Sequence, residues 1–144
     1  MKELSQIAQA VQASTTLAID AMFKQMKADG IDVIGFGAGE PDFNTPDNIK
    51  AAAVKAIDEN KTRYTPAAGI MELRKAACQR LREDCGLEYQ PTQIVAASGA
   101  KHSVYIALQV LVNPGDEVIL PAPFWVSYYE LIKMVGGTPV VITA

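Results

Sequence analysis

The sequence predicts an α/β fold with a mainly parallel sheet. From Ile94 onward, short apolar runs of strand length alternate with longer runs of helical period. Alternation of this kind is typical of parallel sheets joined by right-handed crossovers. The composition, with 49% hydrophobic and 20% charged residues, is that of an ordinary globular domain. A chain of 144 residues is also long enough to bury a core.

The first half of the chain predicts three helices. Ser14-Thr15-Thr16 offers an N-cap for a helix that ends at Gly30. Thr45-Pro46 offers a cap and a first-turn proline for a second helix that ends near Asn60. Leucine and alanine at helical spacing carry a third helix, which stops at Gly86.

The segments between these helices predict a strand, a loop and a turn. A short strand is expected from Asp32 to Phe36. It runs into residues 35–43, where three glycines at alternate positions precede Pro41, and this pattern predicts a shaped loop. The stretch from Tyr64 to Gly69 is rich in turn-forming residues.

The second half predicts a βαβ unit and its continuation. We expect strands at 94–97 and 117–120, joined by a helix over 101–112. A helix from about 124 to 135 and a strand at 138–142 extend the alternation. Because α/β domains seldom end directly after such a strand, we expect the chain to be truncated after the first strands of a larger domain.

Composition excludes several classes of function. The net charge is −3 and no more than two basic residues are adjacent, so we expect no nucleic-acid partner. No apolar run approaches the roughly 20 residues that span a bilayer, and the N-terminus has no signal-peptide pattern, which predicts a cytoplasmic protein without a membrane contact. Cys78 and Cys85 lie too far apart on one helix for a disulfide and are expected to be thiols. We expect no metal site.

Two loops at strand ends are candidates for ligand binding. Ser98-Gly99-Ala100 joins a predicted strand to a helix, where backbone N–H groups and the helix dipole favour a phosphate, although so short a motif taken alone more often marks an ordinary βα turn. Trp125 follows the next strand and could stack on a planar ring or simply pack against its own helix. Tyr64 is either a surface residue or a phosphate donor, and His102 is expected to be structural.

The joint order of several motifs resembles the fold-type I pyridoxal-phosphate-dependent aminotransferases of the aspartate aminotransferase class. The resemblance covers the whole chain. The motifs are Gly39–Phe43 followed by Thr45-Pro46, Tyr64–Gly69, Ser98–Lys101, Asn113–Asp116, and Pro123–Trp125 with Tyr128. The resemblance therefore implies the N-terminal part of a type I PLP-transferase fold. It also implies residues 1–45 as an arm, helix and substrate loop of the small domain, and residues 46–144 as the first part of the large cofactor-binding domain.

The resemblance also implies a cofactor, pyridoxal 5′-phosphate, and a homodimer. Gly99, Ala100 and Lys101, with Ser98 beside them, match the residues that hold the 5′-phosphate, and Trp125 matches the residue that stacks on the cofactor ring. Tyr64 matches a tyrosine that reaches the phosphate of the neighbouring subunit. The active site would then need two copies of the chain.

Amino-acid and 2-oxo-acid substrates follow from the same resemblance. Gly39 matches a backbone contact to the substrate α-carboxylate, and Thr16 with Thr15 matches an N-terminal segment that closes over the substrate beside Trp125. Lys101 matches a lysine that some members direct at a distal carboxylate. Many relatives have Lys-Pro-Ser where this chain has Gln12-Ala13-Ser14, so prephenate use does not follow.

The implied reaction is transamination between aspartate, or another common amino acid, and a 2-oxo acid such as 2-oxoglutarate. None of the nine lysines matches the Schiff-base lysine of the family, which would lie beyond Ala144 together with the arginine that binds the α-carboxylate. No catalytic residue is therefore assigned, and the 144 residues alone are expected to be inactive. A β-lyase of the same fold and a non-catalytic fragment that binds phosphate or dimerises are the alternatives.

Overall fold

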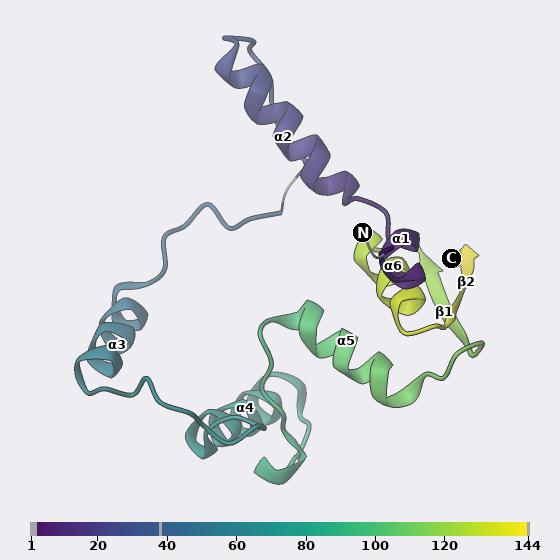
Figure 1. Cartoon of the computed structure of the whole chain (residues 1–144). Coiled ribbons are helices and arrows are strands. Elements are labelled where there is room, and N and C mark those ends of the chain that lie inside the picture. The colour runs from purple at the N-terminus through teal and green to yellow at the C-terminus, as the bar shows by residue number, and fades with distance from the viewer. Residues whose placement is uncertain (1–2, 38, 144) are drawn as a thin grey trace. The chain divides into compact units, whose positions relative to one another are not determined.

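The computed structural model describes residues 3–37 and 39–143 (Figure 1). Internal contacts divide the chain into two compact units, one of residues 1–40 with 104–144 and the other of residues 41–103. Helix α5, Ala100–Leu111, begins in the second unit and continues into the first.

The core of the first unit is a parallel βαβ unit. Strand β1, Glu117–Ala122, pairs with β2, Thr138–Thr143, from Glu117 opposite Thr138 to Ala122 opposite Thr143. Helix α6, Val126–Met134, forms the crossover between them. Leu120 from β1 and Leu131 and Ile132 from α6 are buried. The parallel α/β arrangement expected from the sequence is confirmed here.

Two turns join at the amino ends of these strands. The side chain of Asp116 accepts from the backbone N–H of Asn113 at 2.7 Å, and its backbone carbonyl accepts from the N–H of Thr138 at 2.8 Å. The N–H of Gly115 donates to the carbonyl of Gly136 at 2.9 Å. Asp116 therefore holds its own turn and the start of β2 together.

The N-terminal part of the first unit contains two helices. Helix α2, Thr15–Ala28, was expected, and its N-cap Ser14 accepts from the N–H of Leu17 through its hydroxyl at 3.4 Å. Helix α1, Gln6–Ala10, was not expected; its signal is Ser5, whose hydroxyl accepts from the N–H of Ala8 at 3.2 Å.

The prediction of a strand from Asp32 to Phe36 is wrong. These residues form no strand in the described chain, because the segment packs against a helix and not beside another strand. A Cβ on Gly35 would lie 2.8 Å from the ring of Phe23, and one on Gly37 would lie 2.8 Å from the side chain of Ile19. The glycines thus permit a close approach to α2.

The second unit contains α3, Asp47–Asp58, α4, Met71–Cys85, and a 3₁₀ turn, η1, at Pro91–Gln93 that was not expected. The N-cap of α3 is Pro46, with no side-chain cap, so the expected Thr45 cap is off by one residue. Helix α4 ends as expected at Gly86, whose φ of 68° lets its N–H reach back to the carbonyl of Arg82.

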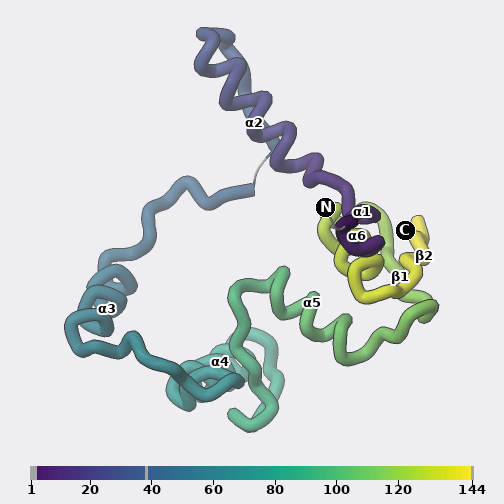
Figure 2. The backbone as a smooth tube through the Cα atoms, in the orientation of Figure 1, coloured from purple at the N-terminus to yellow at the C-terminus, as the bar shows by residue number. Residues whose placement is uncertain are grey.

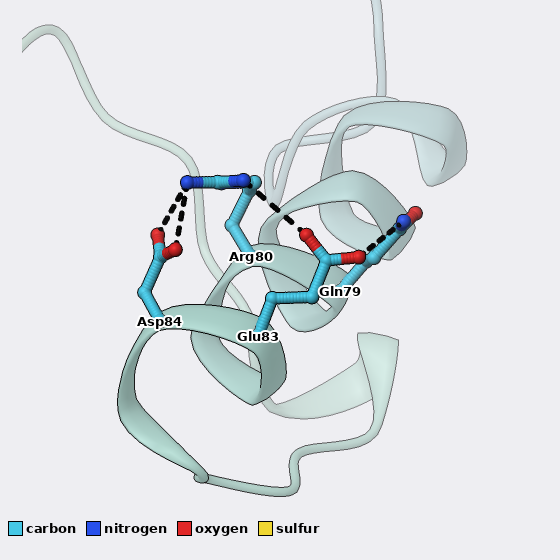
Figure 3. Close-up of polar contacts among 4 residues, drawn as sticks. All are labelled: Gln79, Arg80, Glu83 and Asp84. Atoms are coloured by element: carbon cyan, nitrogen blue, oxygen red, sulfur yellow. Dashed lines mark hydrogen bonds and ion pairs between the residues drawn. The ribbon is translucent and has the colours of Figure 1, made fainter.

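Helix α4 also carries both cysteines and a surface ion-pair cluster. Cys78 is buried and Cys85 is exposed, and both are thiols, as expected. Arg80 lies 2.7 Å from Asp84 and 3.2 Å from Glu83 on the exposed side of the helix (Figure 3). Exposed pairs of this kind stabilise a helix only modestly.

The strand expected at 94–97 is also wrong. The backbone N–H of Ala96 donates to the carbonyl of Ala68 at 3.0 Å, but residues 94–97 form no ladder of hydrogen bonds with a second strand. A Cβ on Gly69, whose φ is 94°, would lie 2.8 Å from the Cβ of Ala96, so the two segments approach closely. The βαβ unit of this structure is therefore β1–α6–β2 and does not include residues 94–97. Across residues 3–37 and 39–143, no helix is long and apolar enough to cross a membrane.

Candidate functional site

The loop before α5 runs through a left-handed glycine into the start of the helix. Gly99 has a φ of 84°, a left-handed conformation that favours glycine, and its N–H donates to the carbonyl of Ala97 at 2.9 Å. The carbonyl of Gly99 accepts from both the N–H and the hydroxyl of Ser103, at 3.2 and 3.3 Å. Gly99, Ala100 and Lys101 are exposed at the start of the 12-residue helix, where the dipole favours an anion.

His102 takes part in this loop, a contact that the sequence reasoning missed. Its Nδ1 accepts from the backbone N–H of Ser98 at 3.2 Å, which requires that Nδ1 carry no proton. The amide of Ser98 is thus engaged within the loop, and Ser98 would reach an anion through its hydroxyl. The four-residue spacing between Ser98 and His102 was the available signal, but spacing alone does not give the orientation of the ring.

Trp125 is the residue that caps the start of α6. It follows β1 and the cis peptide bond between Ala122 and Pro123, and it is 47% exposed. The centroid of its indole lies 5.9 Å from the centroid of the Tyr128 ring in an edge-to-face contact, and this contact fixes the orientation of the indole. The position is at the carboxyl end of a parallel strand, where ligands of open α/β sheets bind.

Tyr64 projects fully into solvent from the loop between α3 and α4. Thr62 and Arg63 line a shallow hollow beside it. Three residues earlier, the pKa of Lys61 is raised by its hydrogen bond and ion pair with Glu59, 2.6 Å away. The loop therefore offers a phenol hydroxyl and a guanidinium at the surface of the second unit.

The two remaining candidates lie in the N-terminal part of the first unit. Thr16 is half-buried in the first turn of α2. Gly39 is exposed, and nothing lies within 4 Å of a Cβ built on it. Its backbone is therefore accessible to a ligand.

The candidates thus fall into two groups by unit. Tyr64 and the loop Ser98–Lys101 lie within residues 41–103, and Thr16, Gly39 and Trp125 lie in the unit of residues 1–40 with 104–144. The geometry described above for each residue is that within its own unit.

The donor set of these residues fits pyridoxal 5′-phosphate. A phosphate monoester suits backbone N–H groups at a helix N-terminus, with a hydroxyl and an ammonium group beside them. The loop at 98–101 supplies these groups, and the left-handed Gly99 leaves the space in front of them open to a ligand. A planar pyridine ring suits the oriented, half-exposed indole of Trp125.

The sequence of this chain is similar to those of curated aminotransferases. Residues 31–144 match the family described as aminotransferase class I and II. The aspartate aminotransferase of Bacillus sp. (strain YM-2) is 52% identical across the whole chain, which covers 37% of that protein. An aspartate/prephenate aminotransferase of Cereibacter sphaeroides is 49% identical across the whole chain, which covers 36% of it.

Solved structures give the same result. The chain aligns over its full length with the Thermus thermophilus aspartate aminotransferase bound to maleate, with a TM-score of 0.95 and 39% identity. It aligns over 98% of its length with an alanine aminotransferase from Pyrococcus furiosus, with a TM-score of 0.89 and 29% identity. The chain spans 38% and 36% of those two structures. Because the family match extends over residues 31–144, the chain belongs to the class I and II aminotransferases.

Proposed function

We propose that this chain is the N-terminal part of a pyridoxal-phosphate-dependent aminotransferase. The enzyme transfers an amino group between aspartate, or another common amino acid, and a 2-oxo acid such as 2-oxoglutarate. The observation that carries the proposal is the loop at Ser98–Lys101, where the left-handed Gly99 leads into the N-terminus of α5, in a chain whose residues 31–144 match the class I and II aminotransferases. The cofactor, when bound, supplies the electron sink for chemistry at the substrate α-carbon.

The residues of this chain hold and orient the cofactor. The backbone amides of Ala100 and Lys101 and the hydroxyl of Ser98 bind the phosphate at the positive end of α5, and the left-handed Gly99 shapes the loop that holds it. The indole of Trp125 lies against the ring and sets its tilt, because the contact with Tyr128 already fixes the indole.

The substrate contacts support an acidic amino acid. Gly39 offers its backbone to the α-carboxylate, and Thr16 and Trp125 bound the substrate on other sides. The ammonium group of Lys101 offers a positive charge to a distal carboxylate of the substrate. Maleate, which is bound in the Thermus thermophilus relative, is a dicarboxylate and supports this substrate class.

The proposed enzyme is a homodimer. Tyr64 is fully exposed, as expected of a residue that contacts a phosphate bound to a second copy. Arg63 beside it would add a positive charge at the same interface.

The proposed reaction also needs a lysine that this chain does not supply. The relatives are more than twice as long as the chain, which covers 37% of the Bacillus sp. protein. Sequencing the coding DNA past the codon for Ala144, with the intact mass of the cellular protein, tests this. We expect an open frame that encodes the lysine, and we expect no transamination by the isolated 144 residues.

Cofactor binding can be tested directly because Trp125 is the only tryptophan in the 144 residues. Pyridoxal phosphate stacked on the indole should quench its fluorescence, and pyridoxal without the phosphate should quench far less at the same concentration. Gly99→Val, which blocks the loop, should abolish the difference. Equal quenching by both compounds, in this chain and in the longer protein, would contradict the proposed site.

A further inference from the structure

An ion pair on α6 contacts the segment that joins α1 to α2. Lys133 Nζ lies 3.4 Å from Glu130 Oε2, one helical turn away. The same ammonium donates to the carbonyl oxygen of Ala10 at 3.1 Å, and the same carboxylate accepts from the backbone N–H of Gln12 at 3.4 Å. One ion pair therefore binds two backbone groups that are 123 and 118 residues away in the sequence.

The pair is less exposed than the other ion pairs on the helices within residues 3–37 and 39–143. The side chains of Lys133 and Glu130 are 29% and 21% exposed, whereas those of Lys50 and Asp47 on α3 are 53% and 97% exposed. Partial burial reduces screening by salt and water, so contacts of this pair hold more firmly than those at the open surface. Lys133 also lies 5.6 Å from the centre of the Tyr129 ring, which further fixes the ammonium group.

Helix α1 depends on such external contacts. It has five residues, far fewer than the roughly 12 that an isolated helix needs in water. None of its residues is buried, and Ile7 is 53% exposed, so apolar packing contributes little to its position. Figure 2 shows α1 lying against α6, and the polar contacts of Glu130 and Lys133 are what join them.

We propose that Glu130 and Lys133 form a clamp that fixes residues 5–12 on α6 and thereby positions the start of α2. Only Ala13 separates the clamped Gln12 from Ser14, the N-cap of α2. Thr16, in the first turn of α2, is held in place through this short connection. The clamp itself stands on the contacts above; its effect on substrate rests on the proposed function, in which Thr16 contacts the amino acid. Glu130 and Lys133 act as positioning residues.

The test compares five variants in the full-length protein. Lys133→Met removes the donor to Ala10, Glu130→Leu removes the acceptor for Gln12, and Lys133→Arg keeps a donor. Lys24→Met is the matched control. It removes an equal positive charge from the ion pair of Lys24 with Asp20 on α2, which lies outside residues 5–12. Amide hydrogen exchange measures how firmly the segment around residues 5–12 is held. Steady-state kinetics and the absorbance of the bound cofactor measure the effect on the proposed active site.

The clamp predicts exchange at residues 8–14 on the order of tenfold faster in Lys133→Met and Glu130→Leu, as expected for lost hydrogen bonds to charged groups. Lys133→Arg and Lys24→Met should match the parent. The KM for the amino acid should rise severalfold in the first two variants, with the cofactor absorbance unchanged. Glu130→Gln, which keeps the shape and an acceptor, should fall between Glu130→Leu and the parent.

Two results would overturn the proposal. Unchanged exchange in Lys133→Met and Glu130→Leu would show that no clamp operates. Faster exchange with an unchanged KM would remove the positioning role while leaving the proposed transamination intact. If the parent itself transfers no amino group, the proposed function fails, and the exchange data still decide whether the clamp exists.

Discussion

The hydrogen bond between His102 and Ser98 shows how one side chain can shape a binding loop without contacting the ligand. The imidazole Nδ1 accepts from the Ser98 amide at 3.2 Å, and this draws the loop back toward the first turn of α5. The left-handed Gly99 then places the amides that follow it at the helix start. The loop thus depends on Nδ1 of His102 acting as a hydrogen-bond acceptor.

A pair of substitutions at His102 tests that dependence. His102→Leu removes the acceptor, and we expect a loss of about threefold to tenfold in pyridoxal phosphate affinity, the range expected for one ordinary hydrogen bond. His102→Asn places an oxygen at nearly the position of Nδ1 and should bind close to the parent level. Titration of both variants with the cofactor provides the measurement. Equal weakening in the two variants would show that the contact does not shape the loop.

Residue-scale features differ in how well the sequence revealed them. The left-handed positions at Gly86 and Gly99 were predictable, because a glycine directly after a helix or before one has few other roles. The half-exposed position of Trp125 at the start of α6 followed from its place after a strand. The contacts of His102, Glu130 and Lys133 were not predictable, because they depend on side-chain orientation and, for the clamp, on a fold that joins distant segments.

At the scale of elements, helices were predicted better than strands. Caps and spacing are local, so α2, α3, α4, α5 and α6 appear within a few residues of their expected bounds. A strand exists only if a second strand pairs with it. Residues 32–36 pack on α2 and residues 94–97 make a single bond to Ala68, so neither becomes a strand although both have suitable residues.

The packing of α6 on the turn before β2 gives a stability prediction. Gly137 is buried, and a Cβ on it would lie 2.8 Å from Cγ1 of Val112 and 3.1 Å from Cγ2 of Ile132. Gly137→Ala should therefore lower the free energy of unfolding by about 1–3 kcal/mol, the usual cost of overpacking. Urea unfolding measures the change.

A second substitution serves as the control for this clash. Val112→Ala removes the nearest methyl group, so the double variant with Gly137→Ala should be less destabilised than the sum of the two single variants. Strict additivity would mean that contact with Val112 is not the source of the strain.

At the scale of the whole molecule, the described residues leave much apolar surface uncovered. On α3, Ile49, Val54 and Ile57 are 53%, 57% and 64% exposed, and Ile119 on β1 is 66% exposed. Side chains of this kind are stabilised by burial, at roughly 25 cal/mol per Å² of apolar surface. These surfaces support the proposal that the working protein contains further chain and a second subunit.

The dimer proposal predicts that damaged subunits can complement each other. Tyr64→Phe removes the hydroxyl offered to the neighbouring site, and Gly99→Val blocks the phosphate loop of its own subunit. Each variant alone should bind pyridoxal phosphate weakly. A mixed dimer has one site with an intact loop and an intact tyrosine, so binding should return to one site of each mixed dimer, about a quarter of all sites when the subunits assemble at random. No recovery on mixing would show that Tyr64 does not act across the interface.

The central claim is that the protein moves an amino group between an amino acid and a 2-oxo acid. In the most direct measurement, the full-length protein is supplied with pyridoxal phosphate, ¹⁵N-labelled aspartate and 2-oxoglutarate. The proposal predicts that the label appears in glutamate while aspartate becomes its 2-oxo acid. Label released as ammonia would indicate a lyase. Label that stays in aspartate, and in every other common ¹⁵N-labelled amino acid supplied in its place, with the cofactor bound would contradict the claim altogether.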